Sequence, residues 1–207
     1  MRSRALLTPI VALALLSGCA SVGSSGFGSS GFYLVEPGPH SVDRGTMIVT
    51  PTIRWNRTSR SFNTQSRWEE WTLNGPLLDS LSFIGALESG KPIIRQRKKA
   101  DRQVPQFRPD MSPPELASML ESFYRIRGGA TAFSITNLSP RPFIGSQGFQ
   151  IDYDYRGGDE VDRRGRAVGA VIGDRLYLIA FDAAMKHYFP AAIPEFERIA
   201  QSAQLRG

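Results

Sequence analysis

The side chains best suited to covalent catalysis in this chain are its two histidines, His40 and His187, and the serines that lie beside glycines. A serine hydrolase places its nucleophile in the pattern G-x-S-x-G and needs a histidine as general base. The stretch Gly145-Ser146-Gln147-Gly148 lacks the first glycine at that spacing and is more typical of a turn. His187 starts the last helical region, where a histidine on a helix surface is the simpler interpretation. The sequence therefore predicts no catalytic residue.

Carboxylates gather in one part of the chain, at positions 152, 154, 159, 160 and 162. A calcium loop of the EF-hand type needs oxygen ligands at fixed positions along its length. Counted from Asp152, the fifth and twelfth positions are Arg156 and Arg163, which are cations. We therefore expect no metal and no cofactor. Asp152 and Asp154 are instead expected on the solvent face of a strand whose other face is apolar.

Two adjacent carboxylates, Glu69 and Glu70, are a further candidate for acid and base chemistry. Neighbouring residues of a strand point to opposite faces, so this pair would be separated and unlike the paired carboxylates of a glycosidase. The tryptophans Trp55, Trp68 and Trp71 are expected in the core, and a ligand groove lined by them is the alternative.

The single cysteine, Cys19, lies at the end of an apolar leader. Residues 1–18 begin with two arginines, continue with an apolar stretch and end in small residues, which is typical of a signal peptide. The apolar stretch is shorter than the roughly 18 residues that span a membrane. The tetrapeptide Leu16-Ser17-Gly18-Cys19 resembles the lipobox of bacterial lipoproteins. The alternative is an ordinary secretory leader with an incidental cysteine.

The lipobox resemblance implies cleavage between Gly18 and Cys19, a diacylglycerol thioether on the Cys19 thiol and acylation of the new amine. Two or three acyl chains anchor a protein stably, whereas one chain anchors it marginally. Ala20 stands where an aspartate would resemble an inner-membrane retention signal, so the resemblance implies the periplasmic face of the outer membrane. The Gly- and Ser-rich residues 19–31 are expected to form a flexible tether, followed by one domain over residues 32–207.

Positive charge is concentrated in one segment of a chain whose formal net charge is +6. Seven lysines and arginines lie between positions 91 and 108, opposed by Asp101 alone. We interpret six of them as a possible surface for a polyanion or an acidic partner: Lys91, Arg95, Arg97, Lys98, Lys99 and Arg102. Nucleic acid is excluded as a partner by the envelope location that the leader implies. The alternative is a solvated loop that keeps the protein soluble.

Hydrophobic spacing predicts the elements that must position these residues. Strands are expected near 46–55 and 68–73, a further strand near 92–97, and four tightly turned strands at 130–138, 148–156, 166–172 and 175–181. Helices are expected over 77–90, after the capping residue Ser112, and in a last helix broken near Pro190 and resumed at Pro194. Short turns between consecutive strands require antiparallel pairing, so the fold class is α+β, an antiparallel sheet flanked by helices.

Element order over residues 46–207 resembles the PsbP-like fold, which extrinsic photosystem subunits share with the Ran-binding Mog proteins. The likeness includes Trp71-Thr72-Leu73-Asn74-Gly75 and the hairpin over residues 170–179. It implies a sandwich of helices around an antiparallel sheet, and it carries no site residue because function belongs to sites. With the leader, it favours a lipid-anchored binding or assembly module of the envelope. The alternatives are an envelope hydrolase and a carrier of a small apolar ligand.

Overall fold

The described residues are 31–59, 68–94 and 104–206, in a computed structural model. The expected leader, Cys19 and the tether up to residue 30 lie outside them, and so do Arg95, Arg97, Lys98, Lys99 and Arg102 of the basic segment. No helix among the described residues is long and apolar enough to cross a membrane.

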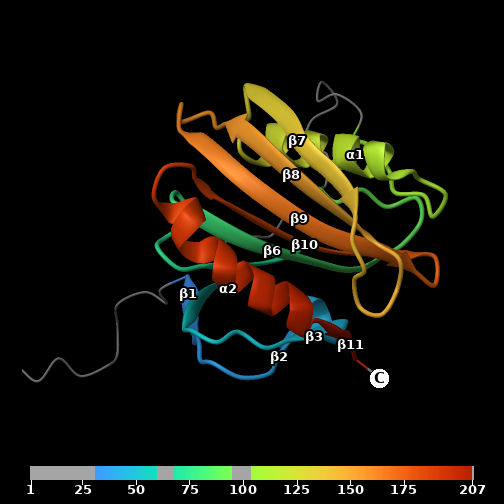
Figure 1. The fold of residues 1–207 in the computed structure, drawn as a ribbon, viewed down its shortest axis with the longest axis horizontal. Coiled ribbons are helices and arrows are strands. Elements are labelled where there is room, and N and C mark those ends of the chain that lie inside the picture. Colours follow the sequence, from blue (N-terminus) through green and yellow to red (C-terminus); the bar gives the residue numbers. More distant parts are fainter. Residues whose placement is uncertain (1–30, 60–67, 95–103, 207) are drawn as a thin grey trace, which may run out of the picture. The chain divides into compact units, whose positions relative to one another are not determined.

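An eight-stranded antiparallel sheet forms the centre of the domain (Figure 1). Its strand order from one edge to the other is β1 (Phe32–Val35), β4 (Trp55–Thr58), β5 (Glu69–Thr72), β6 (Asp79–Leu87), β10 (Arg175–Ala184), β9 (Asp162–Ile172), β8 (Phe149–Arg156) and β7 (Ala132–Pro140). The strands of the N-terminal half therefore lie on one side, those of the C-terminal half lie on the other, and β6 meets β10 between them.

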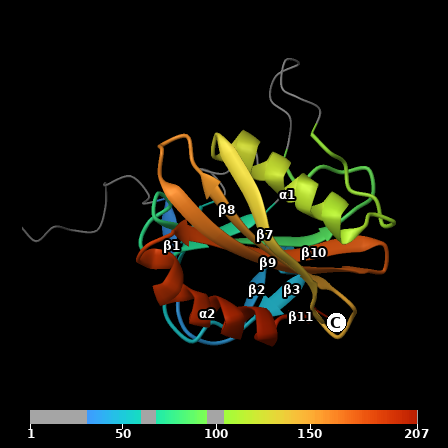
Figure 2. The same ribbon diagram turned by 45° about the horizontal axis from the view of Figure 1, so that its top comes forward.

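Two helices and a small second sheet complete the domain. The helices are α1 (Pro113–Arg127) and α2 (Tyr188–Ser202), and the small sheet has the order β11 (Gln204–Leu205), β3 (Met47–Val49) and β2 (His40–Val42). A short 3-10 turn, Asp43–Gly45, joins β2 to β3. Figure 2 shows α1 on one side of the large sheet, with α2, β2 and β3 on the other.

The central strands of the large sheet are consequently covered on both faces, and each face has its own core. The core between the sheet and α1 contains Ile84, Phe107, Leu120, Phe123, Ile151, Tyr153 and Leu178. The core between the sheet, α2 and the small sheet contains Met47, Trp55, Trp71, Leu81, Phe83, Phe181 and Phe196. This arrangement confirms the predicted α+β class with helices flanking an antiparallel sheet.

The helix after Ser112 and the four late strands are confirmed. Glu115 accepts hydrogen bonds from the backbone N–H and the hydroxyl of Ser112, both at 2.7 Å, which fixes the start of α1. β7, β8, β9 and β10 pair in sequence, although β9 starts at Asp162, four residues before the expected position. The sequence analysis was wrong on the break in the last helix, because α2 is continuous and contains Pro194. Pro190 lies in its first turn, where a proline is tolerated.

The prediction of a helix over 77–90 was wrong, because residues 79–87 form the central strand β6. Both faces of β6 are covered, so apolar residues occur on both: Leu81 and Phe83 face α2, and Ile84 faces α1. An extra residue near Ala86, whose φ is 49°, shifts the register against β10 and turns Leu87 toward α1 as well. The spacing of Leu81, Ile84 and Leu87 therefore imitates a helix.

The first expected strand, over 46–55, is divided between two sheets. β3 ends at Val49 in the small sheet, and β4 starts at Trp55 in the large one. Of the strand expected over 92–97, the described residues 92–94 hold a single bridge position at Ile94, and residues 95–97 lie outside the described part.

Candidate functional site

A buried network of charged and phenolic side chains connects the end of α1 to the sheet. Asp182, near the C-terminal end of β10, is 4% exposed. Its carboxylate accepts hydrogen bonds from the hydroxyls of Tyr124, at 3.0 Å, and Tyr155, at 2.6 Å. The Tyr124 hydroxyl also lies 2.5 Å from that of Tyr153. Two buried tyrosines therefore donate directly to one carboxylate, and the third, Tyr153, is linked to it through the Tyr124 hydroxyl.

Arg127, in the last turn of α1, supplies the positive charge of this network. Its Nη2 donates to the carboxylate of Glu70 and, at 3.0 Å, to the hydroxyl of Ser80. Its Nη1 lies 4.0 Å from Oδ1 of Asp182. The guanidinium carbon also lies 5.5 Å from the ring centre of Phe123 and 5.9 Å from that of Trp68. One cation thus faces two buried carboxylates and two aromatic rings.

Burial changes the pKa values of Asp182, the three tyrosines and Arg127. Loss of solvent raises the pKa of Asp182 above its ordinary value, against the opposing effects of Arg127 and the two phenols. Burial, followed by the Asp182 charge, raises the pKa values of Tyr124, Tyr153 and Tyr155. Burial alone would lower the pKa of Arg127, but the attraction of Glu70 and Asp182 raises it. Arg127 therefore stays charged, and the phenols stay protonated.

The raised pKa of Asp182 leads to a first prediction. Its contribution to stability is fully present below the pKa of the unfolded chain, about 3.9, and is lost as the pH rises through the native pKa. In urea titrations over this pH range, the free energy of unfolding of the wild type should fall with rising pH relative to that of Asp182→Asn. A difference between the two proteins that is independent of pH would contradict the raised pKa.

A pocket of about 290 Å³ opens beside this network. Its lining includes Tyr124, Tyr155, Arg127, Asp182, Asp159 and Arg163. Arg163 comes from β9, and its Nη2 donates to the backbone oxygen of Leu77, at 2.8 Å, and to Asp159, at 2.7 Å. The end of α1 and the turn between β8 and β9 meet at the rim, where Gly158 N–H donates to the Gly128 oxygen at 3.0 Å.

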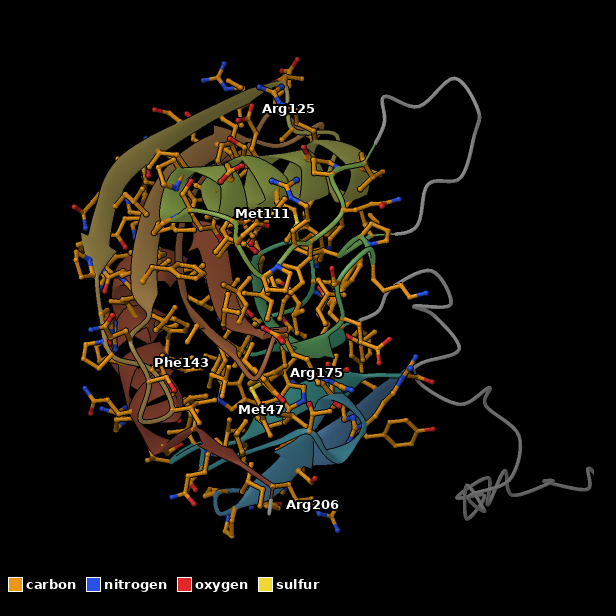
Figure 3. All side chains as sticks on the ribbon, turned by 90° about the vertical axis from the view of Figure 1, so that its right-hand side faces the viewer. Met47, Met111, Arg125, Phe143, Arg175 and Arg206 are labelled. Carbon is orange, nitrogen blue, oxygen red and sulfur yellow. The ribbon has the colours of Figure 1, made fainter. Side chains whose placement is uncertain are left out.

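A second pocket, of about 220 Å³, has a basic lining. Arg44, Lys91 and Arg175 contribute to it from three separate segments, together with Glu88 and the buried Asp43. Arg175 lies 3.5 Å from Glu88, and both side chains are about half exposed. Figure 3 shows Arg175 at this side of the domain, with Arg206 further along it. Of the six basic residues interpreted as a binding surface, Lys91 is the one within the described ranges.

The remaining candidates from the sequence lie on β5, in the core and at the start of α2. Glu69 and Glu70 lie on opposite faces of β5: Glu69 pairs with Arg57 at 2.9 Å, and Glu70 pairs with Arg127 on the α1 side. The tryptophans Trp55, Trp68 and Trp71 are all buried, as the core interpretation predicts. His187 is exposed at the start of α2, and no hydrogen bond from its imidazole to a described residue is present.

The carboxylates of β8 are paired with arginines on its solvent face, opposite its buried aromatic face. Asp152 contacts Arg166 at 2.6 Å, and Asp154 contacts Arg164 at 2.8 Å. The predicted alternation of this strand is therefore confirmed. The stretch Phe143–Ser146 forms a turn closed by two backbone hydrogen bonds of 3.0 Å, so the serine there occupies a turn, as expected.

The sequence analysis missed the network around Arg127 and Asp182. A usable signal existed in β10, where Asp182 is the one charged residue within an otherwise apolar and aromatic run from Leu176 to Ala184. A lone carboxylate on a buried strand must find hydrogen-bond donors. Tyrosines that alternate along β8, the strand beyond β9, can supply them.

Comparison with known proteins places the fold in a class. No family model matches the sequence, and no curated protein matches it. Among solved structures, the solution structure of cyanobacterial PsbP (CyanoP) from Synechocystis sp. PCC 6803 has a TM-score of 0.54 at 13% identity, covering 91% of this chain and 99% of that chain. The crystal structure of LpqN, involved in cell envelope biogenesis of Mycobacterium tuberculosis, has a TM-score of 0.46 at 10% identity, covering 85% and 92% respectively.

The chain is thus an α+β sandwich with an antiparallel sheet between helices. More narrowly, its fold is PsbP-like, as its element order predicts, and the likeness to CyanoP is one of fold.

Proposed function

We propose that this chain is a lipid-anchored binding or assembly module of the bacterial cell envelope, held at the periplasmic face of the outer membrane through Cys19. The leader of residues 1–18, the lipobox tetrapeptide ending at Cys19 and the Gly/Ser-rich residues after it support the anchor. The domain that follows would then act at a fixed surface, within reach of other envelope components.

The partner we propose is an anionic envelope polymer, and one observation carries this choice: Arg44, Lys91 and Arg175 converge on one pocket. Two backbone hydrogen bonds join the ends of the basic segment at this place, from Gly90 N–H to the Phe107 oxygen at 2.8 Å and from Phe107 N–H to the Lys91 oxygen at 3.0 Å. These two bonds hold Phe107 beside Lys91, which is one of the three converging cations.

These cations are available to a partner. Arg44 and Lys91 make no ion pair with any residue in the described ranges, and Arg175 is held only by an exposed contact with Glu88. Exposed ion pairs of this kind contribute little, about 0–1 kcal/mol, so exchanging Glu88 for a polymer phosphate or carboxylate costs little. An excess of one charge sign on an open surface also attracts oppositely charged polymers over several ångströms.

Charge reversal tests the surface. Each basic residue near an anionic surface contributes about 1 kcal/mol to the free energy of binding. The loss of two such residues should therefore weaken binding by roughly thirtyfold. We expect this for Arg44→Glu with Arg175→Glu and for Lys98→Glu with Lys99→Glu, measured as co-sedimentation of the full-length protein with purified lipopolysaccharide and with cell-wall sacculi.

The matched control reverses two other exposed arginines, Arg54 and Arg156, which pair with Glu36 and Asp162. If this control loses as much binding as the two test pairs, the effect reports net charge and the proposed surface is wrong. Crosslinking in intact cells, read by mass spectrometry, distinguishes an acidic protein partner from a polymer.

A Cys19→Ala variant should leave the outer-membrane fraction, and unchanged fractionation would contradict the anchor.

The geometry gives less support to the two alternatives. A hydrolase built on His187 needs a hydrogen-bonded base and nucleophile in a pocket, and His187 is exposed. A carrier of an apolar ligand needs an apolar cavity, whereas arginine and carboxylate side chains line the two pockets described above.

A further inference from the structure

We propose that the pocket between Arg127 and Arg163 is a second binding site, which takes the carboxylate of a small ligand or of a chain end. The site lies against the α1 face of the sheet and is built from residues of α1, β9 and β10. The inference rests on these side chains alone, so it stands whether or not the domain is anchored or binds a polymer.

Arg163 is the first residue that points to a ligand. It is 8% exposed, and its Nη2 donates to both Leu77 and Asp159. Its Nη1 is fully buried and has no hydrogen-bond partner among the described residues. A buried guanidinium nitrogen without an acceptor is costly, because it has lost water and gained nothing in return.

Arg127 also has guanidinium N–H groups that donate to no residue in the described ranges. Its Nη2 is used by Glu70 and Ser80, but its Nη1 is 4.0 Å from Asp182, beyond hydrogen-bond distance. For its Nε, no acceptor is present in the described part of the chain. With 21% of its side chain exposed beside the pocket, Arg127 can present its Nη1 to a ligand. A charged N–H group of this kind donates a strong hydrogen bond to a carboxylate oxygen.

The charges around the pocket disfavour a second negative charge on the ligand. Glu70 accepts from one side of Arg127, and Asp159 accepts from one side of Arg163. Asp182 adds a third carboxyl group that is bonded to phenols. With two guanidinium groups among three carboxyl groups, binding depends on hydrogen bonds from the remaining guanidinium nitrogens, and a dianion such as phosphate is repelled more strongly than a carboxylate.

The size of the pocket limits what accompanies the carboxylate. About 290 Å³ is at the lower end of ligand-binding cavities, which are roughly 300–1,000 Å³. The rim is narrow where Gly158 meets the end of α1, because a Cβ on Gly158 would lie 3.3 Å from the Gly128 oxygen. Such a pocket takes a small carboxylic acid or the last residue of a peptide, and these two sources share the same chemistry.

The experiment is a calorimetric titration of the full-length protein with four probes: N-acetylalanine, trialanine, trialanine amide and inorganic phosphate. We expect the two free carboxylates to bind, and the amide and phosphate to bind at least about tenfold more weakly. Tighter binding of trialanine than of N-acetylalanine assigns the site to a peptide end, and the reverse assigns it to a small acid. Equal binding of trialanine and its amide, or binding of none of the probes, would overturn the proposal.

The variant Arg163→Gln should weaken binding of the free carboxylates by about tenfold or more. Arg163→Lys should weaken it less, because lysine keeps the positive charge but lacks the planar set of N–H donors. Arg164→Gln is the matched control, since Arg164 is the next residue of β9 and pairs with Asp154 on the solvent face. Equal effects of Arg163→Gln and Arg164→Gln would refute the site. Urea unfolding of each variant shows that the domain is folded during the titration.

Discussion

Replacing Arg127 by methionine is expected to lower the free energy of unfolding by about 3–5 kcal/mol. Methionine keeps most of the side-chain length that packs against Phe123 and Trp68, so the change removes mainly the charge. Glu70 and Asp182, at 8% and 4% exposure, would then remain buried without their cation. Urea denaturation at pH 7, followed by tryptophan fluorescence, measures the difference.

Arg125 provides the matched control for this prediction. It lies two residues before Arg127 in the same helix, forms an exposed ion pair with Glu121 at 2.8 Å and faces solvent. Arg125→Met should therefore cost less than about 1 kcal/mol. Adding Glu70→Gln to Arg127→Met should recover part of the loss, since the carboxylate left behind is then neutral. Equal costs for Arg125→Met and Arg127→Met would show that the buried network contributes little.

The substitution Gly165→Ala is expected to cost about 3 kcal/mol, at the upper end of ordinary overpacking. Gly165 lies directly across from Tyr153 in the pair β8 and β9, and the tyrosine ring covers it. A Cβ at this glycine would come within 2.2 Å of the ring. The ring cannot move aside easily, because it is fully buried and its hydroxyl is bonded to that of Tyr124. Thermal and urea unfolding report the loss.

Two further variants separate this clash from a general effect of removing glycine. At Gly128, whose φ is −105°, a Cβ would contact only the Tyr124 oxygen at 3.4 Å, so Gly128→Ala should change stability little. In a Tyr153→Leu background the ring is absent, and Gly165→Ala should then cost less than about 1 kcal/mol. An unchanged cost in that background would mean that the ring is not the obstacle.

The elements that could be predicted from the sequence are those whose signals are local. α1 has its capping residues and a one-sided apolar pattern, and the hairpin from β9 to β10 has Gly173 and Asp174 in its turn, both with positive φ. β6 could not be predicted in this way, because burial on two faces and the irregularity at Ala86 remove the period of two. Its strand conformation depends on pairing with β5 and β10. These strands become its neighbours only in the tertiary fold.

The same distinction applies to the sites. The basic segment is visible because its lysines and arginines lie close together in the sequence. The network around Asp182 joins Glu70 to Arg127 across 57 positions, and Tyr124 to Asp182 across 58. No spacing rule connects residues so far apart, since only the sheet order brings β5, α1 and β10 together. Lys91 lies next to Arg44 and Arg175 for the same reason.

The meeting of β6 and β10 at the centre of the large sheet also sets when the domain can fold. Asp79 in β6 pairs with Ala183 in β10, so the joint between the two halves closes a long stretch of chain. Contacts between residues so distant in sequence form slowly. During synthesis, the N-terminal strands must wait for the segment up to residue 184 before their central edge is covered. The large sheet therefore cannot be completed until β10 has emerged.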